Sequence, residues 1–249
     1  LIKIAFLGTK QIGQVCLDYL LSMQEKIGCE VVCVLSNQRQ LHGNGSLSVR
    51  KTAESHGIPV LPSLEAYLAS EEVDLAISVQ YHQILKPVHI LKARERTVNL
   101  HMAPLPEYRG CNQFSFSIVN GDTEFGTTIH EMDAGIDSGH ILAERRFPMP
   151  EGCFVGELYE LAYKESFELF KEALPALVSG KLEPIPQSDR KGVRSELHYR
   201  KEIDSLKRID PDWDADKISR HVRATAMPGF PPPYMILGGK KVELNLVDG

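Results

Sequence analysis

The chain has 249 residues, of which 43% are hydrophobic and 24% charged, and its formal net charge is −5 at pH 7. This composition is typical of a folded globular protein and excludes a disordered one. The acidic balance and the lack of a basic stripe argue against a protein that grips a nucleic-acid backbone. We therefore expect a small-molecule partner and no nucleic-acid partner.

The first hundred residues alternate short apolar runs with helical patterns. Strands are predicted over 2–7, 30–35, 58–61, 75–79 and 97–101, and helices after Lys10, over 47–56 and over 64–68. This β-α-β-α order predicts an α/β fold, a Rossmann-like and mostly parallel sheet with helices on both faces. In such sheets ligands bind beyond the carboxyl ends of the strands.

The pattern changes after residue 110. We predict a helix over 114–120, strands over 125–132 and 140–144, a long amphipathic helix over 155–177 and a hairpin that turns at Gly238-Gly239. A polar stretch begins at residue 187. We therefore divide the chain into a main domain, residues 1–186, and a small C-terminal subdomain, residues 187–249.

Cys29 and Cys33 lie in one apolar run, and the total of five cysteines is odd. Residues four apart on a strand share a face but are too far apart for a disulfide, and no second pair completes a zinc site. We expect buried free thiols and a reducing, cytoplasmic setting. Gly8 follows the first apolar run and no stretch of 18 apolar residues occurs, so neither a signal peptide nor a membrane span is predicted.

The first turn, Gly8-Thr9-Lys10-Gln11-Ile12-Gly13, has neither the G-x-G-x-x-G pattern nor a P-loop. A glycine turn before a helix N-terminus accounts for most of it. Lys10 could still meet an anionic ligand there, because helix N-termini attract anions.

Asn99 and His101 are two apart at the end of a predicted strand, so they point to one face. Polar groups at the end of an apolar strand are costly if they are buried and idle. A proline-rich turn follows, which would hold the strand end rigid. From these residues alone, a reacting pair and a satisfied core histidine beside a strand-capping Asn carry about equal weight.

The second informative run lies between His130 and His140 and carries Asp133 and Asp137 among glycines. Turn chemistry alone explains either aspartate. A His/Asp metal site has no supporting ligand spacing, and we expect no metal.

Together the two runs resemble the folate-dependent formyltransferase family, which includes enzymes acting on methionyl-tRNA, on glycinamide ribonucleotide and on nucleotide sugars. The family pattern is Asn-x-His, a leucine–proline turn ending in aromatic-basic-Gly, then G-x-T-x-H and Asp-x-Gly-x-Ile. The matching segments, in the same order, are Asn99-Leu100-His101, Leu105-Pro106-Glu107-Tyr108-Arg109-Gly110, Gly126-Thr127-Thr128-Ile129-His130 and Asp137-Ser138-Gly139-His140-Ile141. The resemblance touches most of the chain and is weakest over 187–205.

The resemblance implies that residues 1–186 form a formyltransferase catalytic domain and that an amine attacks the formyl carbon of N10-formyltetrahydrofolate. Asn99 would donate to the developing oxyanion, which is worth about 2.7–4 kcal/mol. His101 would take the proton of the amine or stabilise the oxyanion as imidazolium. Asp137 would hold His101 in its tautomer or act on it by charge, although Asp133 fits as well on spacing alone.

The resemblance also suggests binding residues. For the folate cosubstrate these are Gln80, Tyr81, Gln83, Ile84, Leu85, Asp133 and Asp137. For the acceptor they are Lys10, Arg109, Tyr199, Arg200, Met227 and Phe230, with Lys201 as a further cation for a diphosphate. A solvated charged loop explains the cluster around Arg200 at least as well for any single member, and Trp213 is expected to be a packing anchor rather than a stacking platform.

Three branches of the family compete for the acceptor. The tRNA-directed branch carries an extra C-terminal nucleic-acid-binding domain, and the purine-pathway branch ends soon after its catalytic core. The chain looks most like the branch that acts on dTDP-4-amino-4,6-dideoxy sugars in surface-polysaccharide (O-antigen) synthesis. Glycinamide ribonucleotide, methionyl-tRNA and a non-catalytic nucleotide-binding module of the same fold remain alternatives. We also expect a homodimer, formed through the apolar run from Phe230 to Leu244.

Overall fold

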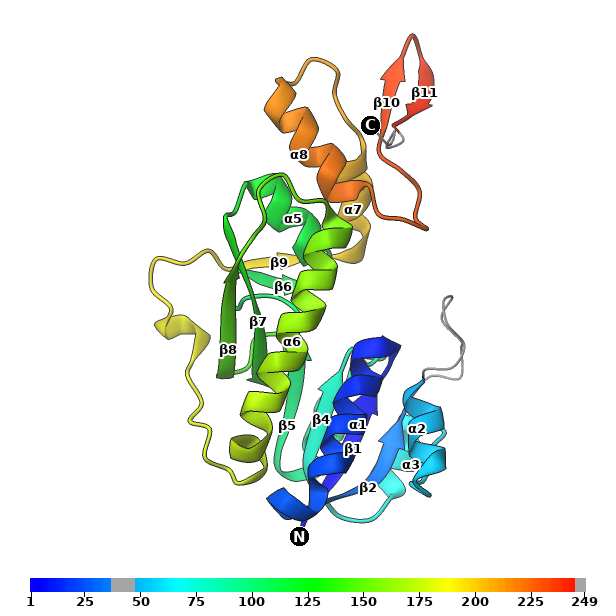
Figure 1. The fold of residues 1–249 in the computed structure, drawn as a ribbon, viewed down its shortest axis with the longest axis vertical. Helices are drawn as coiled ribbons and strands as arrows, with labels where there is room; N and C mark the ends of the chain where they lie inside the picture. The colour runs from blue at the N-terminus through cyan, green and yellow to red at the C-terminus, as the bar shows by residue number, and fades with distance from the viewer. Residues whose placement is uncertain (37–47, 245–249) are drawn as a thin grey trace.

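The computed structural model describes residues 1–36 and 48–244, so Leu47, the first residue of one predicted helix, lies outside the described residues. A seven-stranded sheet runs through the main part of the molecule in the order β3-β2-β1-β4-β5-β7-β8 (Figure 1). Its strands are β1 (Ile2–Gly8), β2 (Cys29–Leu35), β3 (Val60–Leu61), β4 (Val73–Val79), β5 (Ala93–His101), β7 (Glu124–Glu131) and β8 (Ile141–Pro148). The first five are parallel, whereas β7 and β8 run antiparallel to their neighbours.

Helices cover both faces of the sheet, as the alternating pattern predicts. Along β1, Ile4 and Phe6 enter one apolar core while Ala5 and Leu7 enter a second, because successive side chains of a strand point to opposite faces. The first core is covered by α1 (Lys10–Ile27), α2 (Val49–Ser55) and α6 (Val155–Val178), and the second by α3 (Leu64–Ala69) and α4 (Pro87–Ile90). The predicted fold class is confirmed.

The expectation that Cys29 and Cys33 share a face is wrong. Cys29 belongs to the first core and Cys33 to the second. The physical reason is a register shift, since Ile4 pairs with Val31 while the next residue of β1 pairs with Cys33. The extra residue in β2 reverses the alternation of side chains beyond it. The five cysteines are free thiols.

After β8 and α6 the chain returns to the main sheet and then forms a smaller group of elements. The sequence did not predict β6 (Tyr108–Gly110) and β9 (Glu196–His198), which pair in parallel, nor α7 (Ile203–Lys207) and α8 (Ala215–Thr225). The predicted helix after residue 113 is α5 (Gln113–Asn120), and the predicted hairpin is β10 (Tyr234–Leu237) with β11 (Lys240–Glu243).

The small group of elements is tied to the main core. Ala224 of α8 is fully buried in the first core, and the ring of Trp213 lies 4.5 Å from that of His221 on the same helix. These contacts favour the packing interpretation of Trp213. The boundary between residues 186 and 187 stays a prediction. Among the described residues, no helix is long and apolar enough to cross a membrane.

Candidate active site

Asn99 and His101 lie on one face at the carboxyl end of β5, where β7 runs alongside. Asn99 pairs with His130 of β7 across the antiparallel ladder, and His101 pairs with Thr128. His101 is buried, with 5% of its surface exposed. Because the β5–β7 pairing is unbroken from Val98 to His101, the ladder fixes the positions of Asn99, His101 and His130 together.

The imidazole of His101 is held by a backbone carbonyl. Its Nε2 lies 2.7 Å from the carbonyl oxygen of Tyr108. A carbonyl oxygen only accepts, so Nε2 carries a proton and donates it to Tyr108. Nδ1 is therefore the atom of the neutral ring that is open to a proton, and it lies 3.7 Å from Oδ2 of Asp137.

Asp137 brings a carboxylate between the two histidines. Its Oδ2 accepts a hydrogen bond of 2.9 Å from the Gly110 amide, and its Oδ1 lies 3.4 Å from Nε2 of His130. Burial by itself would raise the pKa of this carboxyl, but the charges of His101 and His130 and the hydrogen bonds together hold the pKa of Asp137 below its ordinary range. Asp137 is therefore an anion at neutral pH.

His130 orients the amide of Asn99. Its Nδ1 lies 2.7 Å from the carbonyl oxygen of Glu131, which requires a proton on that nitrogen. When the ring is neutral, Nε2 accepts from Nδ2 of Asn99, at 3.3 Å; when the ring is protonated, Nε2 donates instead to Oδ1 of Asp137, at 3.4 Å. One N–H of the Asn99 amide is used in this way, and the second is left for another acceptor.

The other charged residues of the loop are used locally. Asp133 is exposed, and its Oδ1 accepts from the Gly135 amide at 3.0 Å and from the Ser138 hydroxyl at 2.7 Å. Asp137, rather than Asp133, faces His101. His140 forms an exposed pair with Glu131 at 3.4 Å. Within residues 1–36 and 48–244 no group of three or more His, Cys, Asp or Glu side chains could hold a metal ion.

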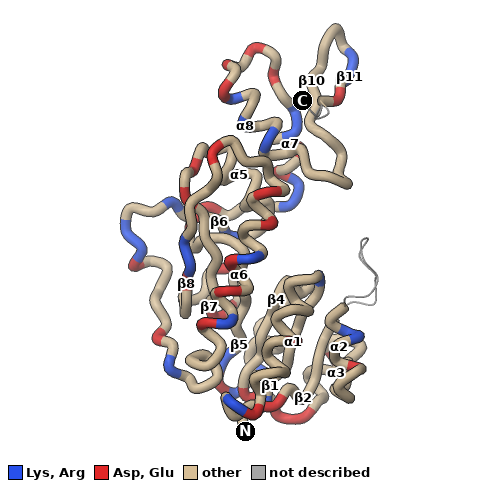
Figure 2. The backbone as a smooth tube through the Cα atoms, in the orientation of Figure 1, with Lys and Arg blue, Asp and Glu red and all other residues tan. Residues whose placement is uncertain are grey.

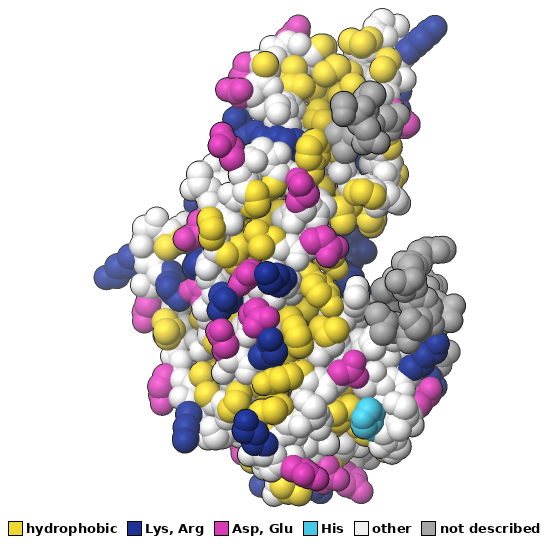
Figure 3. All heavy atoms as spheres, in the orientation of Figure 1, with side chains coloured by type: hydrophobic (Ala, Val, Ile, Leu, Met, Phe, Trp, Pro, Cys, Tyr) yellow, Lys and Arg dark blue, Asp and Glu magenta, His cyan; other side chains and the backbone are white. Residues whose placement is uncertain are grey.

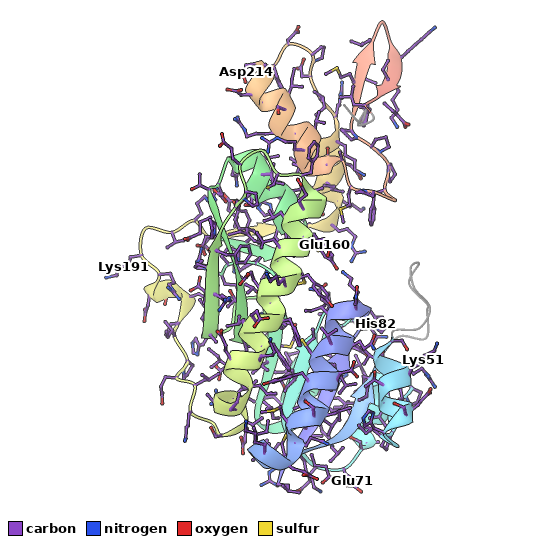
Figure 4. The ribbon with its side chains drawn as sticks, viewed as in Figure 1. Lys51, Glu71, His82, Glu160, Lys191 and Asp214 are labelled. Carbon is purple, nitrogen blue, oxygen red and sulfur yellow. The ribbon has the colours of Figure 1, made fainter. Side chains whose placement is uncertain are left out.

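The predicted folate segment follows β4, the strand beside β5. Between Gln80 and Leu85 the backbone belongs to no helix or strand, and its carboxyl-edge position can be followed through His82 (Figure 4). Leu85 is buried in the second core, Tyr81 and Gln80 are half-buried, and Ile84 is 83% exposed. Gln83 is exposed as well. The segment thus offers irregular backbone and an uncovered apolar side chain.

Lys10, at the start of α1, and Arg200, which follows β9, lie close enough for their charges to interact. Burial, followed by the positive charge of Arg200, lowers the pKa of Lys10, and Cys111 is also close enough to act on it. The ammonium of Lys10 donates to Oε1 of Gln80 at 3.0 Å. Arg109 stands in β6, and its buried Nε has no hydrogen-bond partner among the described residues. Like charges placed together and a buried donor without a partner favour binding of an anion.

The remaining predicted acceptor residues are less tightly grouped. Tyr199 is 58% exposed and precedes Arg200, and the amide of Asn112 donates to both of their carbonyls, at 2.9 and 3.2 Å. Met227 packs on the first core, with its sulfur near Gly156 in the first turn of α6. Phe230 is 64% exposed. These last two lie with the C-terminal elements rather than around His101.

Several groups that build the site were missed by sequence reasoning. The carbonyl of Tyr108 and the amide of Gly110 hold His101 and Asp137, yet backbone groups leave no mark on a residue pattern. His130 was noted as the last residue of the G-x-T-x-H match and as the flank of a weak metal site, but it was given no role in the chemistry. Its place in that match was the available signal.

Comparison with known proteins gives one matching family profile. The profile described as Formyl transferase matches residues 2–174. The methionyl-tRNA formyltransferase of Citrifermentans bemidjiense is 30% identical over 253 residues, which cover 97% of this chain and 76% of that protein.

Solved structures share the fold. An N-formyltransferase from Helicobacter canadensis, in complex with folinic acid and dTDP-3-aminofucose, superposes with a TM-score of 0.79 at 23% identity, covering 97% of this chain and 86% of that one. A 4-N formyltransferase from Francisella tularensis gives a TM-score of 0.76 at 20% identity, covering 98% of this chain and 97% of that one.

Proposed function

Because the chain belongs to the formyl transferase family, we propose that it moves a formyl group from N10-formyltetrahydrofolate to the amino group of a dTDP-linked 4-amino-4,6-dideoxy sugar. Such a reaction would serve surface-polysaccharide (O-antigen) synthesis in the cytoplasm, and the free cysteines fit a reducing compartment. The observation that carries the acceptor proposal is the pair of neighbouring cations Lys10 and Arg200, together with the unpartnered Nε of Arg109, the residue before the Gly110 that donates to Asp137.

The residues after β4 fit a folate. A flat pterin ring needs backbone donors and acceptors on its edge and apolar contact on its face, and residues 80–85 offer irregular backbone together with exposed Ile84. Gln80, Tyr81, Gln83, Ile84 and Leu85 would hold the ring. When bound, the cosubstrate supplies the formyl carbon that the amine attacks.

The reacting residues divide the work by their hydrogen bonds. Asn99 would donate its free N–H to the formyl oxygen, because its other N–H is engaged by His130. Nδ1 of His101 would accept the proton of the amine, since Nε2 already donates to Tyr108. The carboxylate of Asp137 would balance the charge that the imidazole gains. Asp133 would act only through the shape of the loop.

The cations supply the preference for a nucleotide sugar. A diphosphate carries two negative charges, and Lys10 and Arg200 lie close enough to lower the pKa of the lysine. A diphosphate between them would relieve this repulsion and give Nε of Arg109 an acceptor. Tyr199, Met227 and Phe230 would contact the base or the sugar.

Methionyl-tRNA is the second candidate acceptor. It is favoured by the relative from Citrifermentans bemidjiense, whose match to this chain covers the C-terminal elements as well. The distribution of charge is evidence against this acceptor, because Lys and Arg are interspersed with Asp and Glu over the molecule (Figure 2). A surface for tRNA would carry a run of positive charge.

The decisive experiment is a formyl-transfer assay on a panel of amines. We expect product with a dTDP-linked amino sugar, and little or none with glycinamide ribonucleotide or methionyl-tRNA. A 4-amino-4,6-dideoxy sugar and a 3-amino sugar are compared, because the residues do not decide the position of the amine. Product with methionyl-tRNA alone would overturn the acceptor proposal, and product with none of the amines would favour a non-catalytic nucleotide-binding module.

A matched pair of variants tests the cations. Lys10→Met should raise KM for the nucleotide sugar by about 10- to 100-fold, the value of one charge-assisted hydrogen bond. Lys191→Met, on an exposed loop away from the site (Figure 4), should leave KM unchanged. Equal effects of the two variants would contradict a role for Lys10 in binding.

We also propose a homodimer that forms through the proline-rich run and the β10–β11 hairpin. Hydrophobic side chains are uncovered on these elements, and some are visible at the C-terminal end of the molecule in Figure 3. The exposed residues are Phe230, Ile236, Leu237 and Val242. A large uncovered apolar surface is typical of an interface. Light scattering should give twice the mass of the chain, and a monomeric mass would remove this proposal.

A further inference from the structure

The loop that carries Asp137 needs support from outside itself. We call residues 133–139 the Asp137 loop. Asp137 has a backbone φ of +46°, in the left-handed region that non-glycine residues rarely adopt. The loop between Asp133 and Ile136 is exposed to solvent, and it belongs to no helix or strand. Its own side-chain bonds, from Gly135 and Ser138 to Asp133, do not bind the backbone carbonyls of Asp137 and Gly139.

The backbone carbonyls of Asp137 and Gly139 are bound by Gln187. The side-chain amide of Gln187 donates to the carbonyl oxygen of Asp137 and to that of Gly139, each at 2.8 Å. An amide nitrogen has two N–H groups, and these two bonds use both. Gln187 thus fixes the peptide group that follows Asp137, the residue whose backbone is in the left-handed region, and the peptide group that follows Gly139.

Gln187 is itself fixed in place. Two residues earlier, Ile185 exchanges two backbone hydrogen bonds of 2.8 Å with Ile141, the first residue of β8. A short 3₁₀ turn, Gln187–Asp189, begins at the residue itself. Three residues later, the guanidinium of Arg190 pairs with Glu144 of β8. The side chain is therefore presented by backbone that is anchored to the sheet on both sides.

The backbone amide that donates to the Asp137 carboxylate is also held in place by the chain after α6. The amide of Gly110, which donates to Asp137, belongs to β6, and β6 is paired with β9. A side chain at Gly110 would place its Cβ 2.2 Å from the carbonyl oxygen of His198, so the two strands lie in close contact. Gln187 thus binds the carbonyl of Asp137. Strand β9 holds β6, whose Gly110 amide binds the carboxylate of the same aspartate.

We propose that Gln187 is a positioning residue, which holds the Asp137 loop in the conformation that turns the carboxylate toward His101 and His130. The inference rests on the proposed role of Asp137 in formyl transfer. Gln187 lies beyond residue 174, where the family profile ends, and inside the predicted small subdomain. The position of Asp137 in the catalytic constellation then depends on a segment that lies outside residues 2–174, the part that the family profile matches.

The first test is kinetic and uses a double-mutant cycle, measured with whichever amine of the panel gives product. Gln187→Met keeps the length of the side chain and removes both donors. It should lower kcat by about tenfold or more, since small misplacements of a reacting group are costly, and should change KM less than twofold. In an Asp137→Asn background it should have less than a twofold further effect. Full additivity of the two substitutions would overturn the proposal.

Two further variants separate positioning from general damage. Gln187→Glu keeps the shape but turns a carboxylate toward two carbonyl oxygens, so it should lower kcat at least as much as Gln187→Met. Ser188→Ala is the matched control, because Ser188 is a neighbour on the same turn whose hydroxyl donates to Asp189, at 3.5 Å, rather than to the Asp137 loop. It should leave kcat unchanged. An equal loss of kcat in Ser188→Ala would assign the effect to the turn rather than to Gln187.

The second test needs no substrate and stands even if the assigned reaction is wrong. The Asp137 carboxyl is observed by ¹³C NMR in the intact protein at about pH 4, near the ordinary pKa of aspartate. In the wild type it should remain ionised, because its contacts with His101, His130 and Gly110 hold its pKa low despite burial. In Gln187→Met or Gln187→Glu it should be partly protonated. An unchanged ionised signal in both variants would overturn the proposal.

Discussion

The two halves of the candidate site are built in different ways. Asn99, His101 and His130 stand on β5 and β7, where ladder hydrogen bonds fix their backbone. Asp137 stands on a loop with a left-handed backbone, and its position depends on a backbone amide from β6 and on Gln187. The first half is supported by the sheet, and the second by the segment that follows α6.

The two halves therefore differ in how substitutions can affect them. The sheet half presents an amide and an imidazole in a geometry that few substitutions elsewhere can change. The loop half supplies the charge, and it can be displaced by changes in residues that never approach a substrate. Substitutions in the two halves should therefore differ in kind, with turnover lost directly in the first and lost through conformation in the second.

The largest effect is expected in the sheet half. Asn99→Ala should lower kcat by about 100- to 1000-fold, because one donor to a developing oxyanion is worth about 2.7–4 kcal/mol. The melting temperature should stay close to that of the wild type, since Asn99 is only half-buried. Steady-state kinetics with calorimetry checks both quantities. If Asn99→Ala lost stability in proportion to its loss of kcat, the role of Asn99 would be structural rather than catalytic.

A substitution that displaces the support of the loop half should lower the stability of the protein. Gly110→Ala meets the carbonyl of His198 and forces alanine to a φ of +86°, so we expect a loss of about 1–3 kcal/mol in the free energy of unfolding. The matched control is Gly156→Ala in α6, where the nearest atoms to a new Cβ are 3.7 Å away. That variant should be as stable as the wild type or slightly more so. Urea denaturation of both proteins measures the difference.

The charge of Asp137 should appear in the pH dependence of stability. Its pKa is depressed in the folded protein, so its contribution is present above the unfolded pKa of about 3.9 and is lost as pH falls through the lower folded value. The wild type should therefore lose its advantage over Asp137→Asn between about pH 5 and the acid limit, with a slope of at most about 1.4 kcal/mol per pH unit for this single proton. Urea denaturation of both proteins across this range measures the slope. A stability difference between the two proteins that does not change with pH would contradict this.

The sequence predicted the sheet half of the site better than the loop half. The alternation of apolar runs predicted the sheet and its helices, and the two-residue spacing placed Asn99 and His101 on one face. The three-residue strands β6 and β9 are too short to show a period, and they pair across a long stretch of chain. The spacing could not choose between Asp133 and Asp137, because the choice depends on which one is used by Gly135 and Ser138.

The constellation is tested most directly by His101→Ala, with His56→Ala on the exposed end of α2 as its control. We expect formyltetrahydrofolate still to bind, as measured by calorimetry, and formyl transfer to fall by about 100- to 10,000-fold, the usual value of a positioned acid–base group. The control should turn over at the wild-type rate. Near-normal formyl transfer by His101→Ala would contradict the assignment of this histidine.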